Sequence, residues 1–270
     1  MKPYVSLRPK KRLPIKPLLK KIVLAILAVF VISAGIIAYK NKQRIQNKIN
    51  AENGEIILTE PQNNEEKGNN SNQNDLPAID NSPLPSSAII KMPFIVQAPY
   101  ANWDQAHEEA CEEASLIMVN HYLNKTSISE QQQSEKEILD LIDFENKSGY
   151  GLSITLEELA RIAKSYFGLK NPRIVNNVTK ENIEAEIANG KPVIIPAAGK
   201  ILPNPNFRNG GPNYHMLVIK GYNDEYFITN DPGTKNGEGF KYKFDDLINA
   251  IHNWNPENIL NGEKAFLVFD

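Results

Sequence analysis

The fold is decided by the stretch Gln105-Ala-His-Glu-Glu-Ala-Cys111-Glu-Glu-Ala-Ser115-Leu-Ile-Met118, where a polar turn leads into an amphipathic helix. Cys111 is the only cysteine among the 270 residues. A thiol at the start of a helix lies at the positive end of the helix dipole, which favours the thiolate and therefore nucleophilicity. The stretch thus predicts a reactive cysteine at a helix N-terminus.

Two further residues fit such a thiol, and both lie far downstream. His215 stands just before the apolar run 216–222, and Asp231 directly follows the run 226–230. Asn223-Asp224 between the two runs predicts a hairpin, which would bring the histidine and the carboxylate side by side. Asp231 could then orient the imidazole, or Asn230 could do so in its place. The order predicts a cysteine hydrolase with a Cys-His-Asp site.

The remaining pattern predicts helices first and antiparallel strands later. Periodic apolar residues indicate helices at about 110–124, 131–144, 155–168, 179–189 and 244–252. Alternating or β-branched runs indicate strands at 193–196, 216–222, 226–230 and 264–269. This order is typical of an α+β domain rather than of an alternating parallel one. We expect the folded domain to span residues 89–270.

The N-terminal part predicts a membrane anchor. Residues 22–39 form an uncharged apolar run long enough to cross a bilayer core. Eight basic residues precede it within 1–21 and four follow it, so we expect the N-terminus in the cytoplasm and the rest outside. A cleaved signal peptide is the competing interpretation, because Ser33-Ala-Gly35 offers small residues near the end of the run. Residues 40–88 are expected to be a juxtamembrane segment and a disordered linker.

The charge of the chain is segregated. Residues 1–48 contain 12 Lys and Arg residues and no acidic ones, so the remainder contains 18 basic against 32 acidic residues. A folded part with a net charge of about −14 is not expected to bind nucleic acid. The lone cysteine has no partner for an intramolecular disulfide, so an oxidising exterior would leave its thiol free.

Four motifs in order resemble the bacterial peptidase C39-like family. They are Phe94-Ile-Val-Gln97-Ala-Pro-Tyr-Ala-Asn-Trp103, Ala110-Cys-Glu-Glu-Ala-Ser115, Tyr214-His-Met-Leu-Val-Ile-Lys-Gly-Tyr222 and Asn230-Asp-Pro-Gly-Thr234. The resemblance covers about residues 89–270. It implies a papain-like cysteine peptidase fold and a peptide or protein substrate.

The resemblance also implies a role for individual positions. Cys111 matches the nucleophile, His215 the general base and Asp231 the residue that orients this base. Gln97 matches the glutamine whose side-chain amide helps to form the oxyanion hole. Gln105 is a rival for that role, because it lies six residues before the cysteine, but Gln97 belongs to the leading motif of the family.

One position departs from the common family pattern. Gly-Pro usually follows the cysteine, whereas Glu112-Glu113 follow it here. A carboxylate close to a thiolate raises the pKa of the thiol by like-charge repulsion. If Glu112 points away from the cleft, as helix geometry permits, we expect this effect to be small.

Simpler roles compete with the catalytic ones. A lone cysteine in a helix is often a small buried hydrophobe, and Asp231 before Pro-Gly is a common residue at the start of a turn. His107, Glu108, Glu109 and Cys111 resemble a metal cluster, yet no second ligand pair with metal-site spacing follows, so we expect no metal and no cofactor. Trp103 and Trp254 are expected to be packing anchors. The Pro/Asn/Gly-rich stretch 200–214 leads into His215 and could border the cleft.

Three functions remain compatible with the sequence. The first is a membrane-anchored cysteine peptidase, or a related amide hydrolase, on the outer face of the cytoplasmic membrane. The second is an amidase or endopeptidase that acts on peptidoglycan cross-links, although no wall-binding repeat is visible. The third is a catalytically silent binding module on the same frame. A leader peptidase fused to an exporter is excluded, since the chain has one expected span and no ATP-binding motif.

Overall fold

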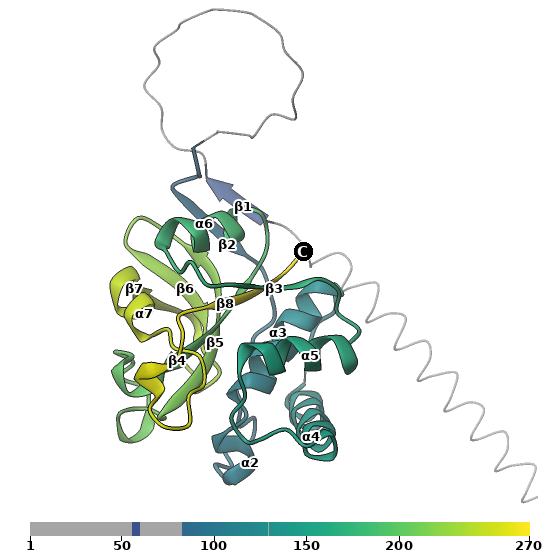
Figure 1. The fold of residues 1–270 in the computed structure, drawn as a ribbon. Helices are drawn as coiled ribbons and strands as arrows, with labels where there is room; N and C mark the ends of the chain where they lie inside the picture. Colours follow the sequence, from purple (N-terminus) through teal and green to yellow (C-terminus); the bar gives the residue numbers. More distant parts are fainter. Residues whose placement is uncertain (1–55, 60–82, 129) are drawn as a thin grey trace, which may run out of the picture. The chain divides into compact units, whose positions relative to one another are not determined.

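The computed structural model describes residues 56–59, 83–128 and 130–270. Figure 1 shows a sheet beside a group formed by α2, α3, α4 and α5, with α6 and α7 apart from this group. The helices are α2 (Gln105–Glu108), α3 (Cys111–Leu123), α4 (Gln131–Ser148), α5 (Leu156–Ser165), α6 (Lys180–Ala188) and α7 (Phe244–Ala250). The strands are β1 (Ile56–Thr59), β2 (Ser87–Ile90), β3 (Pro172–Val175), β4 (Val193–Ala198), β5 (Tyr214–Tyr222), β6 (Tyr226–Asn230), β7 (Glu238–Lys243) and β8 (Phe266–Phe269).

The sheet is antiparallel throughout its described pairings. Its strand order is β1-β2-β5-β4-β8-β3, and β6 pairs with β5 and with β7. The connection between β5 and β6 is the predicted hairpin, in which the Asn223 side chain accepts hydrogen bonds from the backbone N–H groups of Glu225 and Tyr226. The α+β class predicted from the sequence is therefore confirmed.

The five predicted helices and four predicted strands are all present, with ends that shift by a few residues. Helix α5 begins with a capping box, in which the Thr155 hydroxyl accepts from the Glu158 backbone N–H and the Glu158 carboxylate accepts from the Thr155 backbone N–H. At the start of α6, the Thr179 hydroxyl accepts a hydrogen bond from the backbone N–H of Asn182. Local side-chain chemistry thus fixes where these helices begin.

Several elements are absent from the sequence prediction. They are α2, β2, β3, β7 and three 3-10 turns at Gly199–Ile201, Arg208–Gly210 and Ile259–Asn261. In addition, β1 lies inside the segment expected to be a linker and pairs with β2. Its residues Ile-Ile-Leu-Thr favour extended backbone, and the partner strand supplies the hydrogen bonds that a linker would lack.

The core lies between α3 and the central strand β5, which pack against each other. All nine residues of β5 are buried, and ten of the 13 residues of α3 are buried. A strand covered on both faces is apolar in nearly every position, which explains the unbroken Met216-Leu-Val-Ile run. The core therefore fixes the start of α3 against the strand that carries His215.

Within the described residues, no helix has both the length and the apolar character needed to cross a membrane. The basic segment 1–21 and the predicted span 22–39 lie outside the described residues.

Candidate active site

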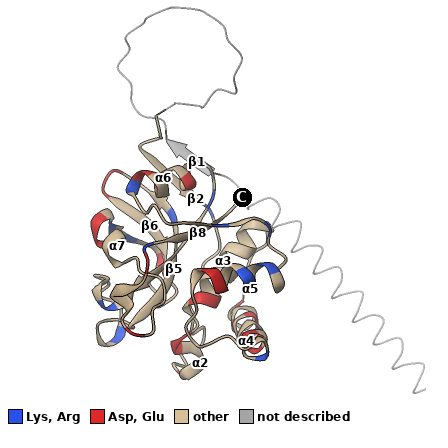
Figure 2. Ribbon diagram, in the orientation of Figure 1, with Lys and Arg blue, Asp and Glu red and all other residues tan. Residues whose placement is uncertain are grey.

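The cysteine lies where the sequence predicts it, at the first residue of α3. The preceding residue, Ala110, is the N-cap and offers no side-chain cap, and its carbonyl accepts from the backbone N–H of Ala114. Glu112 and Glu113 occupy the first turn, and Figure 2 shows acidic residues on α2 and α3. The nucleophile candidate therefore stands at a helix N-terminus that is rich in carboxylates.

His215 lies near the start of β5, and one of its two ring nitrogens is already engaged. Nε2 lies 2.7 Å from Oδ1 of Asp231. Nδ1 is buried and has no hydrogen-bond partner among the described residues. With Nε2 held by the carboxylate, Nδ1 is the nitrogen available to accept a proton.

Asp231 is fully buried and receives four hydrogen bonds. His215 Nε2 and the backbone N–H of Gly233 donate to Oδ1, the latter over 3.0 Å. The Tyr242 hydroxyl donates to Oδ2 over 2.6 Å, and Nδ2 of Asn204 donates to the same oxygen over 3.1 Å. Burial raises the pKa of Asp231, but the His215 charge and these donors outweigh burial, and the pKa lies below its usual value. The carboxylate is therefore kept ionised beside the imidazole.

The imidazole ring is also fixed by packing. Phe207 meets it edge to face, with ring centroids 5.2 Å apart and an interplanar angle of 82°. A Cβ atom added at Gly233 would lie 2.9 Å from Cε1 of His215, so glycine is the residue that lets the turn approach the ring. Asn230, the alternative orienting amide, instead donates to the Pro93 carbonyl over 3.0 Å. Asp231 is thus the residue that holds His215.

The Cys111 thiol is hydrogen-bonded to Glu112, and Nδ1 of His215 has no hydrogen-bond partner among the described residues. It is 3% exposed and donates to Oε2 of Glu112 over 2.8 Å, while a backbone hydrogen bond from Met216 also reaches it. Burial, followed by the charge and hydrogen bond of Glu112, raises the pKa of this thiol well above its usual value. The expected lowering by the helix dipole is therefore outweighed, and the influence of Glu112 is not small.

Gln97 lies at the cleft and is tied to the loop that carries Asp231. Its backbone N–H donates to the Pro232 carbonyl over 3.0 Å. Its Nε2 donates to the carbonyls of His107 and Glu108 over 2.8 Å and 3.1 Å, so both amide hydrogens are engaged. The rival, Gln105, is exposed at the start of α2. Of the two glutamines, Gln97 is the one that lines the cleft.

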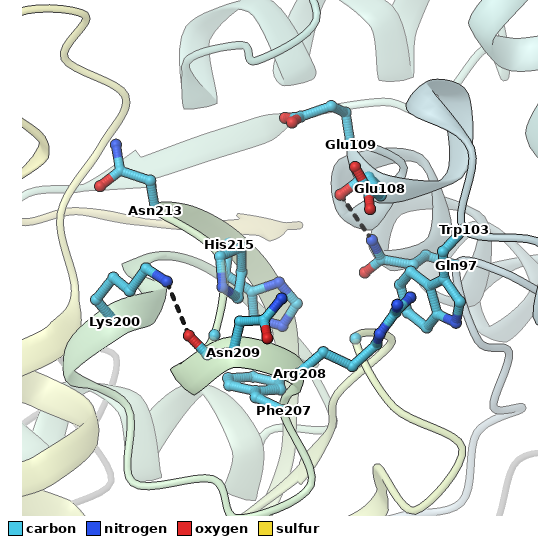
Figure 3. Close-up of a pocket in the computed structure, with 13 residues that line it drawn as sticks. Gln97, Trp103, Glu108, Glu109, Lys200, Phe207, Arg208, Asn209, Asn213 and His215 are labelled. Carbon is cyan, nitrogen blue, oxygen red and sulfur yellow. Dashed lines mark hydrogen bonds between the residues drawn. The ribbon is translucent and has the colours of Figure 1, made fainter.

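A cleft of about 290 Å³ opens in front of His215. Figure 3 shows Gln97, Trp103, Glu108 and Glu109 on one side and Lys200, Phe207, Arg208, Asn209 and His215 on the other. The loop between β4 and β5 therefore borders the cleft, as the sequence suggests. The Arg208 guanidinium lies 5.6 Å from the Trp103 ring centroid, so Trp103 contacts the opposite wall and is more than a packing anchor.

A second cleft adjoins the first and shares Glu109, Pro212 and Asn213 with it. It is also lined by Gly151, Leu152, Ser153, Tyr214 and Trp254. The ring centroids of Tyr214 and Trp254 lie 5.2 Å apart. Trp254 therefore packs against β5 and also forms part of a cleft wall.

His107 has a structural position that does not involve Cys111. Its Nδ1 lies 2.6 Å from Oδ1 of Asp104, and its Nε2 lies 3.2 Å from Oε2 of Glu135 on α4. It thus connects α2 to α4. In the described part of the chain, no group of three or more His, Cys, Asp or Glu residues is arranged to hold a metal ion.

Comparison with known proteins identifies the family. The sequence profile of the Peptidase_C39 like family matches residues 89–258. The chain is also similar to a crystal structure from Bacillus anthracis described as a candidate C39-like peptidase, with 19% identity, a TM-score of 0.44, and coverage of 66% of this chain and 94% of the other. No curated protein matches the chain. Because the family profile spans more than half of its residues, the chain belongs to the Peptidase_C39 like family.

Proposed function

We propose that this protein hydrolyses peptide or other amide bonds, with Cys111 as the nucleophile, His215 as the general base and Asp231 as the residue that positions the base. The observation that carries the proposal is the environment of the His215 ring. Its Nδ1 is buried and has no hydrogen-bond partner among the described residues, while its Nε2 is hydrogen-bonded to the fully buried carboxylate of Asp231. The next residue of β5, Met216, hydrogen-bonds to the Cys111 sulfur through its backbone. A base with a fixed tautomer therefore stands on the strand that the thiol contacts.

The reaction begins when the thiol turns from Glu112 to His215. The S–H bond breaks, the proton moves to Nδ1, and the resulting thiolate attacks the carbonyl carbon of the scissile bond. The imidazolium returns its proton to the leaving amine, and a thioester remains on Cys111. Water, deprotonated by Nδ1, then attacks the thioester, and the thiol regains its proton as the acid product leaves.

The oxyanion of the tetrahedral intermediate needs preorganised donors. The backbone N–H of Cys111 is one candidate, because the first N–H groups of a helix have no partner within the helix. Gln97 is the other, because it lines the cleft with His215. Its amide would have to release the Glu108 carbonyl, the longer of its two contacts at 3.1 Å, before it could donate.

The test uses the full chain in detergent with an unfolded protein as substrate, and mass spectrometry to locate the cleaved bonds. Cys111→Ala and His215→Ala are expected to abolish detectable hydrolysis while thermal unfolding remains cooperative. His252→Ala is the matched control, since His252 contacts the Gly262 carbonyl and lies outside the proposed site. Undiminished hydrolysis by folded Cys111→Ala would contradict the proposal.

The proposal includes a location outside the cytoplasmic membrane, with residues 22–39 as a single anchor and the N-terminus inside. The uncharged run and the excess of basic residues before it support this orientation. Peptides exposed on the outer face, including those of the cell wall, are then the substrates within reach.

Cell fractionation should recover the chain with the membrane, and protease added to intact wall-free cells should remove residues 89–270. Protection of that segment in intact cells would contradict the orientation.

A second candidate is a peptide-binding module without catalysis. The observation that favours it is the contact of the Cys111 thiol with Glu112 rather than with His215. This candidate predicts that the Cys111→Ala variant binds peptides as well as the unaltered chain does, and that neither hydrolyses them. Calorimetric titration with the peptides used in the hydrolysis test measures the binding, and hydrolysis of those peptides by the unaltered chain would exclude this candidate.

A further inference from the structure

Glu112 is a buried carboxyl group in direct contact with the proposed nucleophile, and the reaction above assigns it no step. Its side chain is 2% exposed, and its Oε2 lies 2.8 Å from the Cys111 sulfur. Its other oxygen, Oε1, accepts from the backbone N–H of Ile154 over 3.4 Å. The peptide group of Ile154 is held in turn, because the Tyr214 hydroxyl donates to its carbonyl over 2.9 Å. The carboxyl group is therefore hydrogen-bonded both to the thiol and to the segment that precedes α5.

The thiol donates to one group in this structure, and the proposed reaction requires it to donate to another. Glu112 is the partner in this structure, while Nδ1 of His215 has no hydrogen-bond partner among the described residues. A single S–H group cannot donate to both. The proposed reaction therefore requires the Cys111 side chain to rotate from Glu112 toward His215.

We propose that Glu112 is a positioning residue that holds the Cys111 thiol in a protonated resting conformation turned away from His215, and that ionisation of Glu112 opposes release of the thiol proton. This inference rests on the proposed function, since it takes Cys111 as the nucleophile. In the productive step the S–H bond breaks only after rotation, and the proton goes to Nδ1, so Glu112 neither gains nor loses a proton in the reaction.

The charges that face Glu112 come from three elements. On α3 they are the Cys111 thiol and the Glu113 carboxyl group, on α4 the Glu145 carboxyl group, and on β5 the Tyr214 hydroxyl. None of the four carries a positive charge, and the hydrogen bond from the Cys111 thiol does not outweigh the cost of burying a charged Glu112. Burial raises the pKa of Glu112 to about 8. The carboxyl group is thus expected to ionise before the thiol, and the new charge makes the thiolate harder to form.

The single cysteine of the chain makes the test unusually direct, because every thiol signal comes from one sulfur atom. The alkylation rate of the full chain in detergent is measured across pH for the unaltered protein and for Glu112→Gln. At pH 9 the variant should react at least about tenfold faster, the change that one pKa unit makes in the thiolate fraction. The ratio of the two rates should shrink toward one as the pH falls below about 8, where Glu112 is neutral.

Glu113→Gln is the matched control. Glu113 is the neighbouring buried carboxyl group, but its side chain hydrogen-bonds to Glu145 rather than to the thiol. We expect its alkylation rate to change by less than about threefold. An equal acceleration in both variants would indicate general loosening of the helix and would overturn the role of Glu112. A rate for folded Glu112→Gln that equals that of the unaltered chain at pH 9 would also overturn it.

A second measurement needs no variant. The infrared S–H stretch of the unaltered protein should lie at the lower frequency of a hydrogen-bonded thiol and should shift as the pH passes through about 8. A stretch typical of a free thiol, constant with pH, would contradict the proposal.

The His215→Ala variant separates this inference from the proposed function. If His215→Ala hydrolysed peptides as well as the unaltered chain, His215 would not be the base. The role of Glu112 would still be tested by the S–H stretch and by the alkylation rates of Glu112→Gln.

Discussion

Nε2 of His215 lies 2.7 Å from Oδ1 of Asp231, and both side chains are almost completely buried. This contact decides the tautomer of the imidazole, because a carboxylate accepts a hydrogen bond and cannot donate one. The proton of a neutral His215 is therefore on Nε2, and Nδ1 carries the lone pair. The chemistry proposed for Cys111 depends on that lone pair.

Asp231→Asn should inactivate the protein while leaving it folded. The new amide can donate to Nε2, which would move the imidazole proton to Nδ1 and remove the acceptor for the thiol proton. A loss of about 10³- to 10⁴-fold in kcat is expected by analogy with other orienting carboxylates. Steady-state hydrolysis measures it, with Asp224→Asn in the β5–β6 turn as the control. A loss of less than tenfold would mean that Asp231 has little part in orienting the base.

Tyr242→Phe should lower the stability of the fold and should move the acid limit of that stability to a higher pH. The variant removes the hydroxyl that donates to Oδ2 of Asp231 over 2.6 Å and that also accepts from Asn204 over 2.8 Å. Loss of this buried hydrogen bond should lower the free energy of unfolding by about 1–3 kcal/mol.

The carboxylate also loses a donor in Tyr242→Phe, so the pKa of Asp231 should rise toward its usual value. Ionised Asp231 stabilises the fold above its unfolded pKa, and this contribution is lost as the pH falls through its folded pKa. In Tyr242→Phe the loss should therefore occur at a higher pH than in the unaltered chain. Chemical denaturation at several acidic pH values measures the shift, with Tyr226→Phe on β6 as the control. If the free energy of unfolding fell with acidification in the same way in Tyr242→Phe and Tyr226→Phe, the role of Tyr242 would be contradicted.

Gly233→Ala should displace the imidazole. The added Cβ would lie 2.9 Å from Cε1 of His215 and 3.0 Å from Cε1 of Phe207, so one of the two rings must move. We expect a large loss of kcat with a stability cost of about 1–3 kcal/mol from overpacking. Gly149→Ala is the control, because its Cβ would meet nothing within 4 Å although its φ of +81° makes the backbone strained. If Gly233→Ala and Gly149→Ala lost the same stability and both kept full activity, the position of the His215 ring would not matter for hydrolysis.

The stability of the fold should decrease as the pH rises from about 5 to 8. Burial raises the pKa of Glu145 to about 7, and burial together with the charge of Glu145 raises the pKa of Glu113 well above its usual value. Above the unfolded pKa, the unfolded chain releases a proton that the folded carboxyl group still holds, so the free energy of unfolding decreases until the pH exceeds the folded pKa. The expected change is on the order of a few kcal/mol across this range.

Glu145→Gln should flatten this pH dependence, since it removes one of the two interacting acids. Urea denaturation of the full chain at pH 5 and pH 8 measures the difference. Asp143→Asn, an exposed change on the same helix, should leave the slope as it is. A pH-independent free energy of unfolding for the unaltered chain would contradict the assignment of a neutral, buried Glu113–Glu145 pair.

The positions of the proposed site residues in the fold were predictable where short motifs carry them. Cys111 follows a polar turn, His215 precedes an apolar strand, and the hairpin that joins His215 to Asp231 follows from the turn residues at 223–224. Pattern and topology together therefore account for the contact between His215 and Asp231 and for the packing of the helix that begins at Cys111 on β5. The position of the loop at 200–214 beside the cleft was also predictable, because this Pro/Asn/Gly-rich stretch leads directly into His215.

The residues that support the site were not predictable from local patterns. Tyr242 lies on β7, whose residues Glu-Gly-Phe-Lys-Tyr-Lys lack a clear core pattern because this strand is largely exposed. Asn204 is one of many asparagines, and nothing in a Pro/Asn-rich loop distinguishes the one that reaches Asp231. The direction of the Glu112 side chain was also open, because it depends on Ile154, a residue 42 positions away. These contacts are set by tertiary packing.

The most direct test of the account is to trap the reaction intermediate on Cys111. The full chain is mixed with an unfolded protein or peptide substrate, quenched in acid during turnover and examined by intact mass and peptide mapping. We expect a hydroxylamine-sensitive acyl adduct on the single cysteine, absent from Cys111→Ala and reduced in His215→Ala. Hydrolysis that continues without any adduct on Cys111, or that persists in Cys111→Ala, would contradict it.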